Sequence, residues 1–599
     1  MKYIHFLLLF ICTMATAQNS LVNYSANLPA TDALGRKLPI TNEVKKNRYV
    51  GLFYWLWHYE YQSTNNKPVN LSKFLEDNIG LRNNPKARVS YDDQSWPKDK
   101  VYFWNEPLFG FYTNTDKWVL RKHAEMLADA SIDVLFFDCT NGDSVWKPAY
   151  SALCEVFLEA RKDGIRTPQI AFVTSLSPSD GGQGAINQLY RDVYKPGIYK
   201  DLWFYWKGKP LLLSYPDLMT EVPGNPAGTQ IHQDIKNFFT FRPVQPDYKK
   251  GPERPEQWGW LQIYPQHSFV KKDAGGFEEM PVGVAQNWSK ERGLTAMNAP
   301  NVFGRNYTDA KGQNKKKDAY MYGFNFQEQW DWALKQDIEI VFITGWNEWI
   351  VGRHREWGQQ TNAFPDEYNT ENSRDIEPMK GGHGDNYYYQ MVANIRRFKG
   401  APLENHPSIS KTINIDGVFD EWKTVQPEFK AHKGSTSHRD SPGFQPHHYV
   451  NKSGRNDIVG TRVARDKGYI YFYVITADKL TPHTDPNWMT LYIDIDRKKS
   501  TGWQGYDLVV NRKQPSKKAT VEKNIKGSIW EKLAIAEYAY KGNQLEIRVP
   551  RSLFINSKKL LDFEFKWSDN RQKEGDIMDF WVNGDVAPAG RFNYHYKAN

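Results

Sequence analysis

The sequence predicts a (β/α)8 TIM barrel followed by an antiparallel β-sandwich, and three observations lead to this fold class. Between residues 49 and about 400, short apolar runs alternate with helix-length amphipathic stretches, the pattern of βα units around a parallel sheet. There are eight such apolar runs, the number that a closed barrel needs. Beyond residue 400 strand patterns replace the helical ones, and a chain of 599 residues is too long for one hydrophobic core.

The predicted barrel strands are short and apolar. They cover residues 49–57, 132–138, 169–174, 210–214, 238–242, 258–264, 281–286 and 339–346. Apolar residues recur three and four positions apart in the stretches between them, which predicts helices at 118–130, 150–163, 184–194, 326–335 and 386–398. The segments 63–116 and 357–382 lack periodicity, and we expect them to form loops at the barrel mouth, where active sites are built.

The domain boundaries follow from changes in composition. Residues 1–17 combine a positive start, an apolar run and small residues, which is the pattern of a secretory signal peptide. We expect a catalytic domain at 18–400, a linker at 401–410 and the sandwich at 411–599. The protein is therefore expected to be exported, periplasmic or extracellular, with a surface lipoprotein attached through Cys12 as the alternative. No later stretch reaches the roughly 18 apolar residues that cross a bilayer.

The composition indicates a carbohydrate partner, polysaccharide or oligosaccharide, rather than nucleic acid. The net charge of +9 is modest for this length, and basic residues are interspersed with acidic ones. Aromatic residues make up 15% of the chain, and their rings pack well against the C–H faces of sugars. Filling of a large core is the structural alternative for these rings. Only Cys139 and Cys154 follow the signal, so no disulfide framework is expected.

The most informative motif is an apolar run that ends in a carboxylate, at residues 341–349 (VFITGWNEW). A buried strand that delivers Glu348 into an aromatic pocket is how sugar-cleaving barrels present a catalytic carboxylate. Alternatively, Glu348 caps a helix or pairs with a nearby arginine. Asp138 ends the second strand in the same way, and different surroundings can give the two carboxyl groups different protonation states. An Asx-type turn is the alternative role of Asp138.

Further polar and aromatic residues follow the predicted strand ends and are candidates for substrate binding. They are Trp57, His58, Asn141, Tyr264, His267, Gln286, Trp346, Asn347, Trp349, Arg353 and Glu356. No metal-binding motif, phosphate loop or Gly-x-Ser-x-Gly elbow occurs, so we expect neither a catalytic metal nor a cofactor. The run from Asp494 to Asp496 lacks the remaining spacing of a calcium loop and is interpreted as a hairpin turn, with calcium in the sandwich as the alternative.

The barrel resembles glycoside hydrolase family 99 and family 71-like proteins. The resemblance is carried by Asn347-Glu348-Trp349 after an apolar strand, by the segment 202–213 (LWFYWKGKPLLL) and by the opening 49–54 (YVGLFY). In family 99 the motif continues Asn-Glu-Trp-x-Glu, and the resemblance implies that both carboxylates act on the sugar. Here Val351 occupies the second position, so the partner acid and the mannoside specificity are not carried over.

The C-terminal region is similar to carbohydrate-binding module family 9 and its DOMON-like relatives. The similarity rests on residues 413–422 (INIDGVFDEW) and 505–511 (GYDLVVN). It implies a sugar held between aromatic rings, for which Trp488, Trp503, Trp530 and Trp567 are available. Support of the adjoining catalytic domain is the alternative role of this module.

Together these observations predict an exported glycoside hydrolase, with Glu348 as nucleophile or base and Asp138 as acid. Glu356 and Asp375 are the next candidates for the acid. Carboxyl groups about 5 to 5.5 Å apart favour retention, and a separation of about 6.5 to 9.5 Å favours inversion. A substrate-assisted route, in which Glu348 deprotonates a neighbouring hydroxyl of the sugar, requires neither separation. The alternatives are a non-catalytic glycan-binding barrel and a polysaccharide lyase, for which Arg353 and His58 could supply the neutraliser of the uronate charge and the base.

Overall fold

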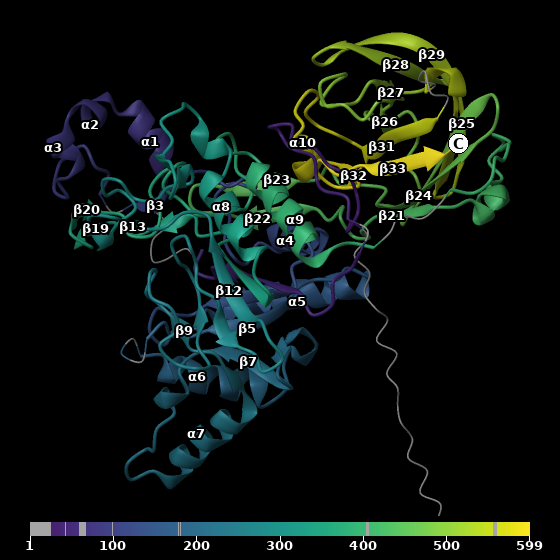
Figure 1. The fold of residues 1–599 in the computed structure, drawn as a ribbon. Coiled ribbons are helices and arrows are strands. Elements are labelled where there is room, and N and C mark those ends of the chain that lie inside the picture. The colour runs from purple at the N-terminus through teal and green to yellow at the C-terminus, as the bar shows by residue number, and fades with distance from the viewer. Residues whose placement is uncertain are drawn as a thin grey trace, which may run out of the picture.

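The computed structural model describes residues 25–598 except 42, 59–66, 99, 178, 180, 403–406 and 555–559. The predicted signal peptide and part of the predicted linker lie outside these residues. A mixed α/β region comes first in the chain and an antiparallel β region follows it (Figure 1). Among the described residues, no helix is both long and apolar enough to span a membrane.

The first region is built on a curled sheet of parallel strands. In spatial order they are β12 (Phe277–Gly283), β17 (Ile338–Thr344), β1 (Tyr49–Tyr54), β4 (Val134–Asp138), β5 (Gln169–Val173), β7 (Lys209–Leu213) and β8 (Thr240–Phe241). The chain continues from β8 into β9 (Val244–Gln245), which pairs in parallel with β10 (Trp258–Gly259). The Gly259 amide donates to the Glu279 carboxylate of β12 at 2.8 Å, so the last strand lies beside the first. This curling is consistent with a barrel, and each of the eight predicted strands overlaps an observed one.

Helices follow most of the parallel strands. They are α4 (Lys117–Asp129), α5 (Lys147–Lys162), α6 (Gln183–Leu189), α7 (Pro226–Phe238), α8 (Phe324–Ala333) and α9 (Asn386–Lys399). The five predicted helices overlap α4, α5, α6, α8 and α9, whereas α7 was not expected. Residues 246–257 and 260–276, all of them described, contain no helix. Pro246, Pro252 and Pro255 account for the first of these gaps, because proline disrupts a helix interior.

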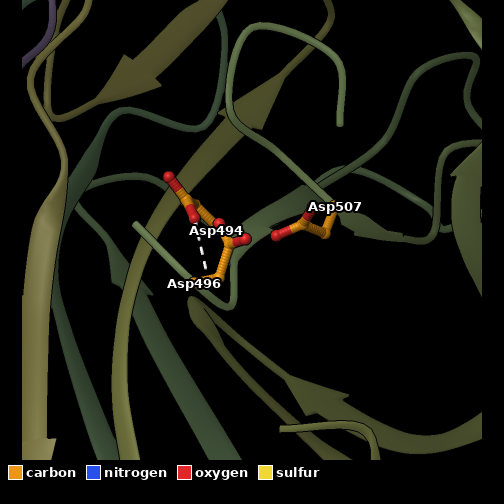
Figure 2. Close-up of side chains that lie close together, drawn as sticks. All are labelled: Asp494, Asp496 and Asp507. Carbon is orange, nitrogen blue, oxygen red and sulfur yellow. Dashed lines mark hydrogen bonds between the residues drawn. The ribbon is translucent and has the colours of Figure 1, made fainter. Parts of the chain in front are cut away.

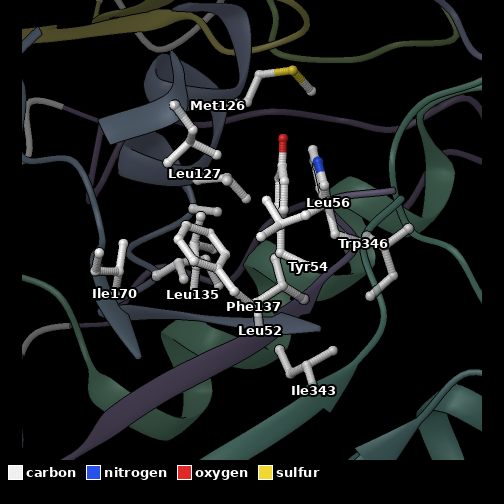
Figure 3. Close-up of a cluster of buried hydrophobic side chains, with 14 of the residues drawn as sticks. Leu52, Tyr54, Leu56, Met126, Leu127, Leu135, Phe137, Ile170, Ile343 and Trp346 are labelled. Carbon is white, nitrogen blue, oxygen red and sulfur yellow. The ribbon is translucent and has the colours of Figure 1, made fainter. Parts of the chain in front are cut away.

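Alternate residues of the strands face two different cores. Leu52, Leu135 and Ile343 lie in a cluster with Leu127 of α4, between the sheet and its helices (Figure 3). Phe53, Phe136 and Phe342 point to the other face, where they form a second buried cluster inside the curl. Near-continuous burial of both faces is typical of parallel sheets and explains the apolar runs in the sequence.

The predicted mouth loops contain short elements of their own. Val351 belongs to β18 (Ile350–Val351), which pairs with β3 (Val101–Phe103), and β3 pairs in turn with β2 (Pro68–Asn70). Val351 is buried beside Tyr102, so it fills a core position. The predicted loops also contain α1 (Leu71–Asp77), α2 (Ile79–Asn83), α3 (Pro85–Arg88) and β20 (Gln360–Ala363). Short strands outside them or at their edge are β11 (Phe269–Lys271), β13 (Trp288–Ser289), β14 (Gly293–Leu294), β15 (Tyr307–Thr308), β16 (Gly312–Gln313) and β19 (His354–Trp357).

The second region is an antiparallel sheet that folds back on itself. Its strands run in the order β21 (Glu428–Lys430), β24 (Ile458–Arg465), β25 (Tyr469–Thr476), β30 (Gln544–Pro550), β29 (Ile529–Lys541), β28 (Ala519–Lys526), β27 (Leu508–Val510), β26 (Thr490–Asp494), β31 (Leu561–Asp569) and β32 (Asp585–Ala587), and β33 (Tyr594–Ala598) pairs with β31. The Ile458 amide of β24 donates to the Asp585 carboxylate of β32, which brings the two ends of the sheet together. One apolar cluster fills the space between the strands.

The two regions pack against each other through buried polar and aromatic contacts. Arg439, on the hairpin of β22 (Arg439–Pro442) and β23 (His448–Asn451), forms an ion pair with Asp116 at 2.7 Å. Arg591 forms another with Asp385 at 2.8 Å. Trp581 of α10 (Asp579–Val582) lies against Tyr388 of α9 and shares the core of the first region.

Candidate active site

Glu348 lies four residues beyond β17, on a loop held by its neighbours. The Asn347 amide exchanges two hydrogen bonds with the backbone of Trp55, at 3.0 and 3.2 Å. The Glu348 amide donates to the Asp375 carboxylate at 2.6 Å. Trp349 stacks on Trp104 with ring centroids 4.6 Å apart. The backbone on both sides of Glu348 is therefore fixed, and the Glu348 side chain is 4% exposed.

Arg374 bridges Glu348 to two other carboxylates. Its Nη2 lies 2.7 Å from Oε2 of Glu348 and 3.2 Å from Oδ1 of Asp366, and its Nε lies 3.5 Å from Oε1 of Glu367. The guanidinium also faces the ring of Trp260 at 5.7 Å. Glu348 is therefore paired with an arginine, which was the alternative role considered for it from the sequence. Aromatic and acidic side chains surround this pair.

The charges of this cluster depend on one another. Burial raises the pKa of Glu348 well above that of an ordinary glutamate, and the Arg374 guanidinium opposes the shift. Burial by itself lowers the pKa of Arg374, but Glu348, Asp366 and Glu367 outweigh it and raise that pKa well above its ordinary value. Arg374 therefore stays cationic. Because the carboxyl groups outnumber this cation, the cluster retains protons in the acidic to neutral range.

Asp138 is the last residue of β4 and belongs to the same electrostatic cluster. Its Oδ1 accepts hydrogen bonds from the amide and hydroxyl of Thr140, at 3.1 and 2.8 Å, which is the turn expected as its structural role. Burial raises the pKa of Asp138 to about 6, the Thr140 hydrogen bonds oppose the shift and the Asp366 charge adds to it. The negative charge of Asp138 also contributes to raising the pKa of Glu348.

A second layer of buried groups supports the loop from below. Glu377 accepts hydrogen bonds from the Trp349 indole at 2.5 Å, from Tyr112 at 2.7 Å and from His123 at 2.9 Å. Asp375 accepts from the Trp104 indole at 2.9 Å and from the Glu348 amide. Asp375, a candidate acid in the sequence, is therefore engaged in holding the Glu348 backbone.

Three predicted substrate-binding residues lie inside the core, which does not fit direct contact with a substrate. Trp346, Asn347 and Trp349 are each 0% exposed. Figure 3 shows Trp346 beside Tyr54 and Leu56 among the apolar side chains. These residues hold the loop that carries Glu348, because their side chains are committed to packing and backbone hydrogen bonds.

The residues that follow β1 remain near Glu348. The His58 ring is buried, and its Nε2 lies 3.3 Å from the Trp349 amide. Burial lowers the pKa of His58 to about 3, so this imidazole is neutral at physiological pH. Trp57 is half-buried and Asn141, after β4, is exposed. All three side chains follow the carboxyl ends of parallel strands, which meet at one edge of the sheet.

Other predicted binding residues contact α8 or a neighbouring loop, and their role in substrate binding stays a prediction. The Gln286 amide exchanges hydrogen bonds with Asn325 of α8, and the Tyr264 ring packs edge-on against Trp332 of the same helix. His267 is half-buried, and its amide donates to Gln262 at 2.8 Å.

The loop after Trp349 also differs from the expectation. Arg353 donates to Asn362 at 2.7 Å and to the Tyr91 carbonyl at 2.6 Å, and its guanidinium stacks on Tyr91 and Trp96. Two of its donors are thus used to brace the loop. Glu356 is exposed on β19, and it is absent from the charges that act on Glu348.

Several residues of the cluster were not predicted from the sequence. Arg374, Asp366 and Glu367 come from the aperiodic segment 357–382, and Trp260 follows the short strand β10. Tyr248 donates to Asn287 at 2.5 Å, and the charges of Arg374 and Glu348 act on its hydroxyl. The sequence signal that could have identified Arg374, Asp366 and Glu367 is the density of charged residues in the segment 357–382, which was already expected to form a loop at the barrel mouth.

The predicted hairpin turn of the second region brings three carboxylates together (Figure 2). Oxygen atoms of Asp494, Asp496 and Asp507 lie within 4.8 Å of one another. Asp494 accepts hydrogen bonds from the amides of Asp496 and Arg497, and Asp507 accepts from Ile495. Burial raises the pKa of Asp494 to about 8 and that of Asp507 to about 6. The turn explains these contacts, and the oxygen set is of the type that a hard cation such as calcium prefers.

Comparison with known proteins gave a weak structural similarity. No family model and no curated protein matches the chain. Two solved structures of the family 99 endo-α-mannosidase from Bacteroides thetaiotaomicron are similar over 58% and 59% of this chain and 97% and 99% of theirs, one of them in complex with Bis-Tris propane. Each is 15% identical, and the TM-scores are 0.32 and 0.34. Similarity at this level transfers neither a residue role nor an activity.

Proposed function

We propose that this protein is an exported glycoside hydrolase that cleaves a polysaccharide or oligosaccharide with a pair of carboxyl groups. One observation carries the proposal: Asp138 ends one strand of the parallel sheet, Glu348 follows another, and the two interact electrostatically but in different surroundings. Glu348 contacts a guanidinium, whereas Asp138 accepts its hydrogen bonds from uncharged Thr140. An acid and a base of the same chemical type need such a difference in environment.

The roles follow from these contacts. We assign Glu348 as nucleophile or base: burial raises its pKa well above the ordinary value, and the Arg374 ion pair opposes that rise and favours the ionised form. Asp138 holds its proton up to about pH 6 and donates it to the leaving oxygen. Both β17 and β4 flank β1, so their backbones are two strand spacings, or about 10 Å, apart across the mouth. The distance between the carboxyl groups then selects retention or inversion, and a substrate-assisted route through Glu348 needs no fixed distance.

The proposal includes the finer architecture. The curled sheet closes as an eight-stranded barrel through the contact between Gly259 and Glu279, with loops in place of two helices. The antiparallel region is a sandwich like that of carbohydrate-binding module family 9. Export follows from the leader pattern of residues 1–17, which places the start of the mature chain near Gln18.

The test is release of reducing ends from a panel of neutral and acidic polysaccharides by the mature protein. Glu348→Gln should lower kcat by about 100- to 10,000-fold, because general acid–base or nucleophilic groups contribute on this scale. Its thermal unfolding midpoint should stay near that of the wild type, since the amide fills the same space. Glu356→Gln, on the exposed hairpin, is the matched control and should remain active. A fully active Glu348→Gln variant refutes the assignment.

A non-catalytic glycan-binding protein is the second candidate. The 4% exposure of the Glu348 side chain and the buried Val351 in place of a carboxylate favour it. It predicts saturable sugar binding with no reducing ends released by the wild type. The lyase alternative loses support because two donors of Arg353, its uronate neutraliser, are occupied. A gain in ultraviolet absorbance from an unsaturated uronate product would restore it.

A further inference from the structure

A cavity of about 620 Å³ lies between the two regions of the chain. Phe109, Trp118 and Lys380 line it from the first region, and Tyr449 and Lys573 are among the lining residues from the second. The volume is in the range of about 300 to 1,000 Å³ that small-molecule pockets occupy. None of its lining residues belongs to the cluster around Glu348.

The cavity is cationic. Lys380, Arg439, Lys452 and Lys573 line it, and the lining contains no carboxylate. Arg439 is neutralised by Asp116 and Lys380 by Glu106. Within the described part of the chain, Lys452 and Lys573 have no ion-pair partner, and both are exposed. Two ammonium groups are therefore free to meet an anion at the rim.

The walls also offer apolar surface, chiefly at Val450 and the half-buried Tyr449, because Trp118 is only 6% exposed and Arg439 covers part of the aromatic rings. The Arg439 guanidinium lies 4.2 Å from the centroid of the Tyr449 ring and 5.1 Å from that of Trp118. Val450 contributes an apolar side chain that is 58% exposed. Sugar rings combine apolar C–H faces with polar edges, so a surface of this kind matches them better than it matches a simple ion.

The cavity is held in a fixed shape. The Phe111 amide donates to the Tyr449 hydroxyl at 2.7 Å, and the Phe444 amide donates to the Phe111 carbonyl at 2.8 Å. Both hydrogen bonds join the first region to the β22–β23 hairpin that lines the cavity. A ligand here would not have to order the walls, which reduces the entropic cost of binding.

We propose that this interface cavity is a second saccharide site that binds an oligosaccharide bearing uronate or sulfate groups. Lys452 and Lys573 contact the anionic groups, and the aromatic and apolar wall contacts the sugar rings. The site goes beyond the proposed hydrolysis and does not depend on it, because its residues are separate from Glu348.

The test is calorimetric titration of the mature protein with trigalacturonate, a sulfated galactose disaccharide, neutral maltotriose and sodium sulfate. The anionic saccharides should bind, and the double variant Lys452→Gln/Lys573→Gln should raise their Kd by roughly 2- to 30-fold, since two exposed ion pairs are lost. Val450→Glu, which adds a carboxylate to the wall, should weaken binding as well. Lys467→Gln changes a matched exposed lysine in the turn after β24 and should have no effect.

Each arm of the titration decides part of the proposal. Preference for trigalacturonate or for the sulfated disaccharide identifies the anionic group. Equal binding of maltotriose, an unchanged Kd in the double variant, or sodium sulfate binding as tightly as the saccharides would each overturn it. Because binding rather than turnover is measured, an enzymatically inactive protein that passes the test supports this site while refuting hydrolysis.

Discussion

At the residue scale, Arg374 determines the charge state of the proposed active site. It is buried, it contacts Glu348 and Asp366 through one nitrogen, and it has Glu367 beside its Nε. A buried cation of this kind favours ionisation of the carboxyl group that it touches most closely. Glu348 at 2.7 Å is that group, whereas Asp138 has no such contact. The assignment of base and acid therefore depends on a residue that does not itself exchange a proton.

Replacing Arg374 by methionine should remove this distinction. We expect kcat to fall by about 100-fold or more, because the charge that opposes protonation of Glu348 is then lost. The free energy of unfolding at pH 7.5 should fall by about 3 to 5 kcal/mol, because carboxylates remain buried without a partner. The loss should be smaller at pH 5, where these carboxyl groups take up protons. Urea unfolding at the two pH values and initial rates test this, with Arg355→Met, at an exposed ion pair, as control. Wild-type activity in Arg374→Met would contradict the role.

Asp138 gives a prediction with a defined pH dependence. Its folded-state pKa of about 6 is raised from 3.8, so the folded protein binds this proton more tightly than the unfolded chain does. Raising the pH from about 4 to above 6 therefore costs stability, up to about 3 kcal/mol. Asp138→Asn should be more stable than the wild type at pH 7.5 and no more stable at pH 4. It should also lose the alkaline decline of kcat near pH 6 together with most of its activity. Equal stability of the two proteins at pH 7.5 would contradict the raised pKa of the buried Asp138 carboxyl group.

At the element scale, the sequence predicts the positions of the strands and the residues near their ends. The apolar runs locate β17 and β4, and Glu348 and Asp138 are found because they end these runs. Helix α7 was missed because its first five residues, 226–230, contain proline and glycine and no large apolar side chain, so the period of Ile231, Ile235 and Phe238 covers only its second half. Arg374 was missed because it reaches Glu348 from 26 residues away, along a loop whose path is set by tertiary contacts. Local patterns do not encode such a path.

The close packing of β1 on β4 gives a prediction for the sheet. A Cβ atom at Gly51 would lie 2.0 Å from the Phe136 ring, so β1 needs glycine where the ring crosses it. Gly51→Ala should destabilise the protein by roughly 1 to 3 kcal/mol through overpacking. Adding Phe136→Leu should recover part of this loss, because the smaller side chain leaves room. Urea unfolding of both single variants and the double variant measures the coupling, and purely additive effects would argue against this contact.

At the scale of the whole molecule, the second region is built into the first. Asp116 accepts hydrogen bonds from the first turn of α4 and pairs with Arg439 of the β22–β23 hairpin. The same stretch of chain carries Tyr112, which donates to Glu377 beneath the Glu348 loop. The hairpin thus contacts the segment that supports the proposed active site. This arrangement fits the alternative in which the C-terminal module supports the catalytic domain, and it also forms the interface cavity.

This docking predicts that the two regions unfold together. Calorimetry of the mature protein should show one cooperative transition, whereas independent domains joined by a linker would give two. Arg439→Met should lower the free energy of unfolding by about 3 to 5 kcal/mol, because Asp116 is left buried without its partner. It should also lower kcat, since the segment with Tyr112 loosens. Lys518→Met, at an exposed ion pair within the second region, is the control and should affect neither quantity strongly. Two separate transitions, with the one for the first region unchanged in Arg439→Met, would show that the C-terminal module is dispensable for the fold of the catalytic part.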